Sequence, residues 1–189
     1  MTFNTALKVS LICCLIIAFG GCQKTSQITI RSNDPGIVHE NGKLLFKGNP
    51  FTGVFLQYNS TGDTNLLEFY ANGLQEGSSV EFYDNQMVRA NRYYHLGKKT
   101  GEHLGFWRDG SKRFVYHFKN DIAEGNQKEW TDKGILIRDF NYEKGQESGG
   151  QKMWYENGNI RMNYTVLNGR RYGLQGVKDC DTIKSNTVK

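Results

Sequence analysis

Glycines, rings and alternating polar positions recur along most of this chain with a period of 24 residues. Counting Gly53 as position 0, further glycines occupy this position at 24-residue steps without an insertion. They are Gly77, Gly101, Gly125, Gly149 and Gly173. The segments between them alternate between apolar and polar residues and contain rings and β-branched side chains, which is typical of strands. The pattern therefore predicts an array of five full β-hairpin repeats.

Four other positions repeat with the same period. Position 5 holds Tyr58, Phe82, Phe106, Trp130 and Trp154, and position 9 holds Gly62, Gln86, Gly110, Gly134 and Gly158. Position 17 holds Tyr70, Tyr94, Phe118, Tyr142 and Val166, and position 20 holds Gly73, Gly97, Asp121, Gly145 and Gly169. Glycines this frequent destabilise helices. Each repeat is therefore predicted to run as strand, tight turn, strand and looser turn.

The apolar positions predict the type of the tight turn and the strand register. A two-residue turn at positions 8 and 9 would pair the rings of position 5 with position 12, where Asn65, Arg89, Arg113 and Arg161 stand. A three-residue loop at positions 7–9, ending in a left-handed glycine, instead pairs 5 with 11, 3 with 13 and 1 with 15. We therefore predict this loop, with the turn at Asn85 and Gln86 the most strained.

In this register the odd positions form one face of the sheet, which we expect to be buried. A single uncovered sheet would leave the same face as an interaction surface. The predicted odd face holds Leu56, Tyr58, Leu66, Tyr70, Val80, Phe82, Tyr94, Leu104, Phe106, Phe114, Tyr116, Phe118, Trp130, Phe140, Tyr142, Trp154, Met162 and Tyr164.

The flanks of the array are less regular. Residues 28–31 alternate and predict an edge strand, and Asn41-Gly42 predicts a shortened first hairpin. We expect one repeat domain over residues 38–180 and a polar tail over residues 181–189. The predicted fold is all-β, an elongated antiparallel sheet of about 12 strands.

The first residues predict export and a lipid anchor. Residues 1–21 combine Lys8 with a short apolar stretch and two glycines before Cys22, which resembles a lipoprotein signal peptide. Diacylation of Cys22, with palmitate among its acyl chains, would hold the chain on the cell envelope, at the outer membrane of a Gram-negative cell, facing the periplasm or the surface. Residues 22–37 would form the lipidated linker that contains the edge strand. The alternative is an ordinary secretory signal with an incidental cysteine.

Charge and cysteine content narrow the function classes. The formal net charge of +5 is mild for a chain with 19 acidic residues, which argues against a nucleic-acid partner. After signal removal, Cys22 and Cys180 remain, with no disulfide framework and no zinc-binding spacing. Cys180 is predicted to be a free thiol or to form an intermolecular bridge.

The residue pattern does not predict a catalytic site, a metal site or a cofactor. The four histidines occupy unrelated repeat positions, although the predicted register brings His117 close to His103. Carboxylates are scattered, and several stand in turns, where they accept backbone hydrogen bonds. Glu81 is predicted to pair with Arg89 across its hairpin. We therefore expect a non-enzymatic protein.

Two rows on the predicted even face are candidates for binding. Position 6 supplies Tyr83, Trp107 and Tyr155, and position 12 supplies Arg89, Arg113 and Arg161. Two strands per repeat would space successive rows by about 9.6 Å. Such rings and guanidinium groups are suited to stacking on sugars, binding acidic chains or contacting a partner protein. The alternative is that the arginines only cover an exposed sheet and keep it soluble.

The repeat resembles the MORN-repeat variant family, the β-hairpin repeats of YwqK-like proteins. Residues 101–110 and 150–158 carry the pattern of glycine, ring and Asn/Asp-Gly turn best, and the resemblance extends over about residues 38–180. It implies antiparallel hairpins, membrane or protein contacts and, for many members, an antitoxin label. We expect a membrane-anchored lipoprotein that binds a protein or glycan, or scaffolds one. The alternative is an envelope immunity or antitoxin-like protein that neutralises a toxin.

Overall fold

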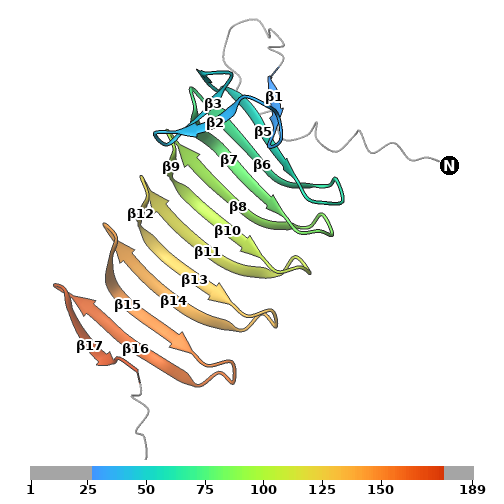
Figure 1. The fold of residues 1–189 in the computed structure, drawn as a ribbon. Helices are drawn as coiled ribbons and strands as arrows, with labels where there is room; N and C mark the ends of the chain where they lie inside the picture. The colour runs from blue at the N-terminus through green and yellow to red at the C-terminus, as the bar shows by residue number, and fades with distance from the viewer. Residues whose placement is uncertain (1–26, 177–189) are drawn as a thin grey trace, which may run out of the picture.

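The computed structural model describes residues 27–176, and every regular element among them is a β-strand. Twelve strands follow one another in a single long sheet, in the order β1-β5-β6-β7-β8-β10-β11-β13-β14-β15-β16-β17 (Figure 1). The short strands β9 and β12 pair with β8 and β11, and β2, β3 and β4 form a separate small sheet. The predicted all-β class and the elongated sheet of about 12 strands are confirmed. No helix in the described range is long and apolar enough to span a membrane.

The strand bounds follow the 24-residue period. The N-terminal strands are β1 (Thr29–Arg31), β2 (Ile37–Glu40), β3 (Lys43–Phe46) and β4 (Asn49–Pro50). The repeats then contribute β5 (Gly53–Tyr58), β6 (Thr64–Ala71), β7 (Leu74–Phe82), β8 (Val88–His95), β9 (Lys98–Lys99), β10 (Gly101–Phe106), β11 (Lys112–Lys119), β12 (Ile122–Ala123), β13 (Gly125–Trp130), β14 (Leu136–Glu143), β15 (Gln146–Trp154), β16 (Ile160–Leu167) and β17 (Arg170–Leu174).

The tight turn within each repeat has the predicted form. In the first repeat, the Gly62 N–H donates to the Asn59 carbonyl at 3.1 Å, and the Asn59 N–H donates to the Asp63 carbonyl at 2.9 Å. The glycines at position 9 have φ between 75° and 87°, the left-handed region. Gln86 takes the same conformation, with φ of 62°, although a side chain makes it unfavourable. The three-residue loop is confirmed.

The predicted register holds for one pair and then fails. Position 5 pairs with position 11 as expected, for example Tyr58 with Thr64, but the next pair is Gln57 with Leu66. The skipped residue, Asn65, is a β-bulge at position 12, and all five hairpins contain it. The predicted pairings of 3 with 13 and 1 with 15 are therefore wrong, because one extra residue shifts the rest of the strand by one position.

This shift divides the predicted odd face between the two sides of the sheet. Positions 2, 4 and 6 of the first strand share a side with positions 13, 15 and 17 of the second, and we call this side the inner face. Positions 1, 3 and 5 share the outer face with positions 14 and 16. Of the residues predicted to be buried on one odd face, only Phe140 and Tyr164 are buried.

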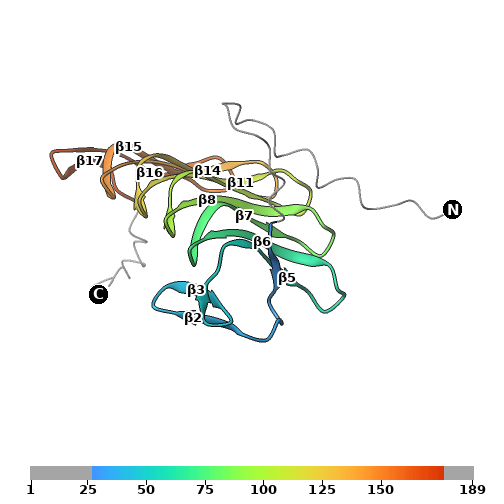
Figure 2. The same ribbon diagram turned by 90° about the horizontal axis from the view of Figure 1, so that it is seen from above.

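The connections between repeats are tighter than expected. Each is a two-residue turn at positions 19 and 20 in which both residues have positive φ, as in a type I′ hairpin turn. They are Asn72-Gly73, Leu96-Gly97, Asn120-Asp121, Lys144-Gly145 and Asn168-Gly169. A second irregularity follows at the position 0 glycine, so that Tyr70 pairs with Gln75 but Glu68 pairs with Ser79. Two bulges per repeat bow each strand (Figure 2).

The register aligns positions 2 and 15 in one row across the middle of the inner face. Phe55 pairs with Glu68 and Glu68 with Ser79, and Gln151 pairs with both Phe140 and Tyr164. The residue at position 2 is buried in each of the five full repeats, namely Phe55, Ser79, His103, Gln127 and Gln151. Most of these residues are polar, so the hydrophobic pattern did not predict their burial.

A second layer covers the inner face at one end only. The small sheet lies on the hollow side of the bowed strands near β5 and β6, and β1 pairs parallel with β5 (Figure 2). Ile30, Leu44 and Phe51 form a core with Phe55, and Leu66 and Tyr70 pack against it. The edge strand and the Asn41-Gly42 hairpin are confirmed, but this hairpin belongs to the covering sheet.

Candidate functional site

Polar side chains at position 2 complete the backbone hydrogen bonding between repeats. In three repeats the side chain bonds to a carbonyl at position 16 of the preceding strand, whereas Ser79 donates to the Glu68 carboxylate at 3.2 Å. The His103 ring lies 2.9 Å from the Tyr93 carbonyl, and the amides of Gln127 and Gln151 donate to the carbonyls of His117 and Asn141 at 2.8 Å. Gln151 also accepts the Asn141 N–H at 3.1 Å. These side chains replace ladder bonds that the bulge interrupts, which explains their burial.

His103 is therefore a structural residue. Its Nε2 faces a carbonyl oxygen, an acceptor, so this nitrogen carries the proton. Burial lowers the pKa of His103, which favours the neutral ring. The side chain of His117 lies on the outer face, where Nε2 is 3.5 Å from Glu102 and Nδ1 is 2.6 Å from the Asn126 carbonyl. The two histidines are therefore close only in the backbone, because their side chains lie on opposite faces of the sheet. In residues 27–176, no group of three or more His, Cys, Asp or Glu residues is placed to hold a metal ion.

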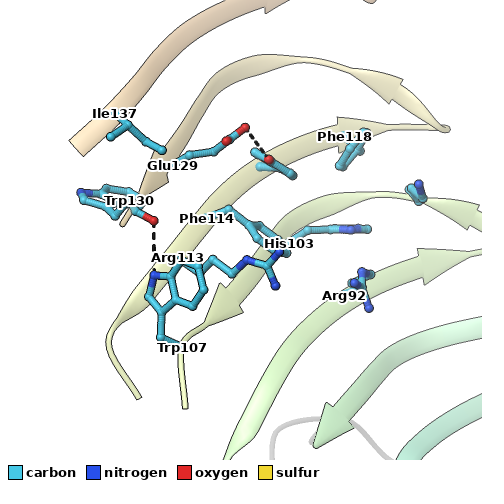
Figure 3. Close-up of a pocket in the computed structure, with 11 residues that line it drawn as sticks. Arg92, His103, Trp107, Arg113, Phe114, Phe118, Glu129, Trp130 and Ile137 are labelled. Atoms are coloured by element: carbon cyan, nitrogen blue, oxygen red, sulfur yellow. Dashed lines mark hydrogen bonds between the residues drawn. The ribbon is translucent and has the colours of Figure 1, made fainter. Parts of the chain in front are cut away.

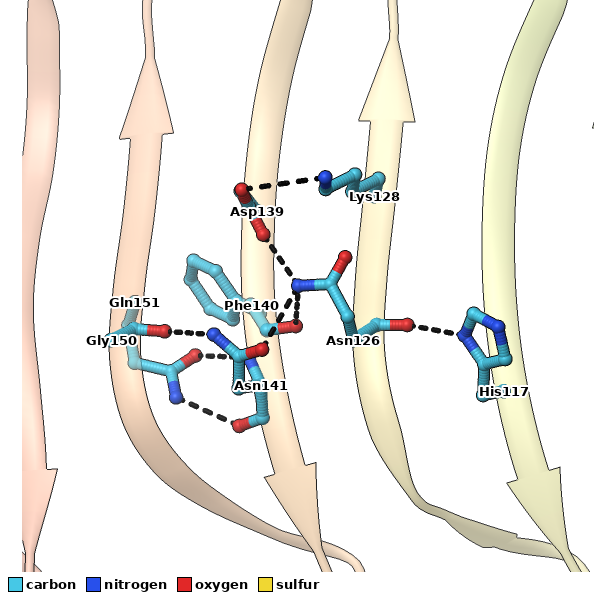
Figure 4. Close-up of polar contacts among 8 residues, drawn as sticks. All are labelled: His117, Asn126, Lys128, Asp139, Phe140, Asn141, Gly150 and Gln151. Atoms are coloured by element: carbon cyan, nitrogen blue, oxygen red, sulfur yellow. Dashed lines mark hydrogen bonds and ion pairs between the residues drawn. The ribbon is translucent and has the colours of Figure 1, made fainter.

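A polar network covers the outer face of the later repeats (Figure 4). The Asn126 amide donates to Asp139 at 2.6 Å and to the side-chain oxygen of Asn141 at 3.0 Å. The Asn141 amide donates to the Gly150 carbonyl at 2.6 Å, and Lys128 lies 3.9 Å from Asp139. These groups bond mainly to one another across β13, β14 and β15.

The carboxylates of the inner face are paired with neighbouring strands. Glu81 lies 2.5 Å from Arg92 and 3.9 Å from Arg89, which confirms the predicted Glu81–Arg89 contact and adds a closer partner. Glu129 accepts from Tyr116 at 2.6 Å and from Arg138 at 2.8 Å. Burial, reinforced by Glu129, raises the pKa of Tyr116.

The last repeat contains the same kind of pair. Glu147 accepts from the Tyr164 hydroxyl at 2.9 Å and lies 2.9 Å from Arg171. Burial, followed by the hydrogen bond to Glu147, raises the pKa of Tyr164 to about 12. Tyr116 and Tyr164 therefore remain neutral hydrogen-bond donors at physiological pH.

The arginines of position 12 and the rings of position 6 meet on the inner face. Guanidinium carbons lie 5.9 Å from the Tyr83 ring centre (Arg89), 5.0 Å from that of Trp107 (Arg113) and 5.7 Å from that of Tyr155 (Arg161). These are cation–π distances. The expected proximity is therefore seen in all three repeats. The sequence also predicted that these arginines lie on the opposite face from most of the other rings. This prediction is wrong, because the bulge places position 12 beside position 13 on the same side.

Two of these rings also connect neighbouring repeats. The Tyr83 hydroxyl donates to the Phe106 carbonyl at 3.0 Å, and the Trp107 indole N–H donates to the Trp130 carbonyl at 3.2 Å. Each ring is therefore held by the next hairpin. A ring fixed at both its edge and its face presents a defined surface to a ligand.

A pocket of about 520 Å³ opens on the inner face over β11 (Figure 3). The residues that line it are Arg92, Lys99, His103, Trp107, Arg113, Phe114, Tyr116, Phe118, Glu129, Trp130 and Ile137. The Phe114 and Tyr116 rings stack with centres 4.6 Å apart. The Phe114 ring occupies the place where a Cβ at Gly105 would lie, 2.0 Å from a ring carbon. Glycine at this position therefore leaves room for the Phe114 ring, and the Phe118 ring stands nearly perpendicular to that of Tyr116.

Two cations in the pocket have no nearby carboxylate. Arg92 and Glu129 are paired as described above, but neither Lys99 nor Arg113 has a carboxylate oxygen within 4.0 Å in the described part of the chain. The Lys99 ammonium lies 5.4 Å from the Phe118 ring centre. The pocket therefore has an uncompensated positive charge at two places.

The structure brings only some of the predicted binding residues together. Trp107 and Arg113 line the pocket, Tyr83 and Arg89 belong to the preceding repeat, and the Tyr155–Arg161 pair lies two repeats further on. Phe114, Tyr116 and Phe118 were predicted as core, and Arg92, Lys99 and Glu129 were missed. The period-two alternation gave no signal for these residues, because sequence neighbours such as Arg113 and Phe114 share a face only at a bulge. Cys22 and Cys180 lie outside the described residues.

Comparison with known proteins does not assign the chain to a family. No protein-family model matches the chain. A search of curated proteins also finds no match. The resemblance to MORN-variant repeats remains a prediction from the repeat pattern.

Proposed function

We propose that this protein is a non-catalytic binding module or scaffold that presents the inner face of its sheet to a partner. The observation that carries the proposal is the difference between the two ends of this face. The small sheet covers the face at β5 and β6, whereas no described residue covers the rings and cations over β8–β16. An uncovered aromatic surface with unpaired cations is typical of an interaction site.

The chemistry of the pocket favours binding over catalysis. Glu129 is engaged by Tyr116 and Arg138, and His103 is held neutral against a carbonyl. A general acid or base needs a proton that it can exchange with a substrate near the working pH. The pocket instead offers rings held in place and fixed positive charges, which favour affinity.

We further propose that an acylated Cys22 holds this module on the membrane of the cell envelope. The support is the sequence alone: a short apolar stretch and two glycines precede the cysteine. Each buried CH₂ of an acyl chain contributes about 0.8 kcal/mol, so two or three chains retain a protein firmly. Metabolic labelling with palmitate should mark the wild-type chain and not the Cys22→Ser variant. Label that persists in the variant would overturn the anchor.

Site-specific crosslinking tests the inner face. A photoreactive phenylalanine derivative at Tyr155, on the inner face, is compared with one at Tyr93, on the outer face. The two sites are matched, since Tyr155 is 44% exposed and Tyr93 is 48% exposed. In intact cells, adducts should form from Tyr155 and not from Tyr93. Equal adducts from both, or adducts from Tyr93 alone, would overturn the proposal, and a toxin in the Tyr155 adduct would indicate the immunity alternative.

A further inference from the structure

We infer that the inner face over β8–β16 docks an extended acidic segment of a partner protein, which places an apolar side chain in the pocket over β11. This inference rests on the proposed function, because it names the kind of partner that the same face binds. Three features of the face support it: an excess of positive charge, a row of arginines at the repeat spacing, and one apolar interruption of that row.

The inner face beyond the small sheet has more cations than carboxylates in the described chain. Its carboxylates on β7, β13 and β15 are each paired with an arginine, namely Glu81 with Arg92, Glu129 with Arg138 and Glu147 with Arg171. Among the described residues, Lys99, Arg113 and Arg161 have no carboxylate oxygen within 4.0 Å. Unbalanced charge of one sign attracts and orients a ligand of the opposite sign. The face is therefore complementary to an acidic partner.

The arginines of position 12 form a row across the repeats. From the first repeat to the fifth, this position holds Asn65, Arg89, Arg113, Ile137 and Arg161. Two strands per repeat separate neighbouring members of the row by about 9.6 Å. Each guanidinium carbon lies 5.0, 5.7 or 5.9 Å from the centre of a position 6 ring, so the ring restricts it before a partner binds. A guanidinium held in this way can bind a carboxylate through two parallel hydrogen bonds.

The fourth repeat interrupts this row with an apolar side chain. Ile137 stands there in place of arginine and lines the pocket together with Trp107 and Trp130 (Figure 3). A uniform polyanion, such as an acidic polysaccharide, would bring a charged group to this apolar site and lose hydration without gaining a partner. A polypeptide can instead place carboxylates opposite the arginines and an apolar side chain opposite Ile137. The interruption therefore favours a protein segment.

The spacing of the row favours an extended conformation of that segment. In a polyproline II helix, every third residue returns to the same side after about 9.3 Å, close to the row spacing of about 9.6 Å. Residues three apart in a β-strand point to opposite sides. Two turns of α-helix advance about 10.5 Å, so the mismatch over three rows reaches about 3 Å, against about 1 Å for polyproline II.

The row therefore predicts the pattern of the partner segment. Carboxylates three residues apart lie opposite Arg89 and Arg113. An apolar side chain follows after three more residues, opposite Ile137, and a third carboxylate lies opposite Arg161 after another three.

The binding test follows the fluorescence anisotropy of labelled ten-residue peptides added to the full chain in detergent. The matched peptide has glutamate as its first, fourth and tenth residues, leucine as its seventh, and proline or alanine elsewhere. Its reversed sequence covers the opposite direction of binding. The controls are a shuffled peptide of the same composition, a four-glutamate peptide in which glutamate replaces the leucine, and a labelled galacturonate tetramer.

In one of its two directions, the matched peptide should bind at least tenfold more tightly than any control. The four-glutamate peptide is the sharpest control, because charge alone would make it the tighter ligand. Absence of binding by the matched peptide in both directions would overturn the inference. Equal or tighter binding by the shuffled peptide, the four-glutamate peptide or the galacturonate tetramer would do so too.

A loss-of-charge variant assigns the binding to this face. Arg113→Gln should weaken binding of the matched peptide at least tenfold, whereas Lys152→Gln, on the outer face, should leave it unchanged. Circular dichroism and the thermal midpoint verify that both variants fold. Unchanged binding by a folded Arg113→Gln variant would contradict the inference.

Ile137→Arg tests the interruption by a change of preference, which misfolding does not produce. Arginine already stands at this position as Arg89, Arg113 and Arg161, so the hairpin accepts it. The variant should bind the four-glutamate peptide at least tenfold more tightly than the matched peptide. A preference that stays with the matched peptide would contradict the role of Ile137 and overturn the inference.

The crosslinking experiment separates this inference from the proposed function. If no peptide binds but Tyr155 crosslinks a protein in cells, the acidic segment is wrong while the inner face stands as the binding surface. If Tyr155 forms no adduct either, both are wrong.

Discussion

The first and the last full repeat fill the most buried position of the inner face in different ways. Position 2 is Phe55 in the first repeat and Gln151 in the last, and both are buried. Phe55 packs into an apolar core that the small sheet completes. Gln151 instead bonds to the backbone of Asn141 across the bulge. One register therefore tolerates either an apolar contact or a hydrogen bond at its most buried row.

The difference follows from what lies above each repeat. Without a second layer, a single sheet buries few large apolar side chains, here Phe140 and Tyr164. Where the second layer is present, burial of rings stabilises the repeat. Where it is absent, the sheet depends on local hydrogen bonds, ion pairs and ring–cation contacts within and between hairpins. The uncovered repeats are consequently the ones with surface left for a ligand.

The largest expected effect comes from Phe55→Ala. Removing a buried ring from the apolar core under the small sheet should cost about 3–5 kcal/mol in the free energy of unfolding. Urea denaturation followed by circular dichroism measures it. A cost below 1 kcal/mol would show that the covered end does not depend on apolar burial, and the comparison between the two ends would fail.

Gln151→Ala makes the matched change in the uncovered repeat. It leaves the Asn141 N–H and carbonyl without their side-chain partner, and we expect a cost of about 2–3 kcal/mol. Lys152→Ala, on the exposed neighbouring residue, should change the free energy of unfolding by less than about 0.5 kcal/mol. Equal values for the two variants would mean that the hydrogen bonds of Gln151 do not stabilise the array.

The pH dependence of stability sharpens the comparison in the middle of the sheet. Burial lowers the pKa of His103 in the folded state, so below about pH 6.5 the unfolded state binds more protons. The contribution of His103 is therefore fully present at higher pH and decreases as the pH falls through about 6.5 toward the folded pKa.

His103→Gln tests this effect, because glutamine fills the same position in the next two repeats and bonds to the same kind of carbonyl. The variant should lose less stability than wild type between about pH 7.5 and pH 5. Urea midpoints at the two pH values measure the difference. Parallel losses in both proteins would refute a folded-state shift at His103.

The smallest expected effect is that of Arg161→Gln. The guanidinium stacks on an exposed tyrosine, and such contacts contribute about 0.5–1 kcal/mol. Differential scanning calorimetry should show a small decrease in the thermal midpoint. A loss comparable to that of Gln151→Ala would make this pair a stabilising element of the sheet and weaken the case for a ligand surface.

The sequence predicted the turns more completely than it predicted which face of the sheet each side chain occupies. The position 9 glycines and the 24-residue period were sufficient for the hairpin loops, because a left-handed residue is a local requirement. The bulge at position 12 was missed, since either parity produced a plausible alternation of apolar residues. The pairing of Arg113 with Trp107 survived this error because both lie near the turn, whose geometry was predicted correctly.

By itself, the sequence determined the repeat, its strands and its turns, since these depend on the conformational preferences of glycine, asparagine and β-branched residues over a few positions. The tertiary structure decided which face each side chain occupies and which end is covered. A single bulge exchanges the faces of a strand, and the docking of β2–β4 over β5 and β6 depends on contacts between residues far apart in the chain, such as Leu44 with Gly73. Those long-range contacts determine that the rings and cations over β11 remain open.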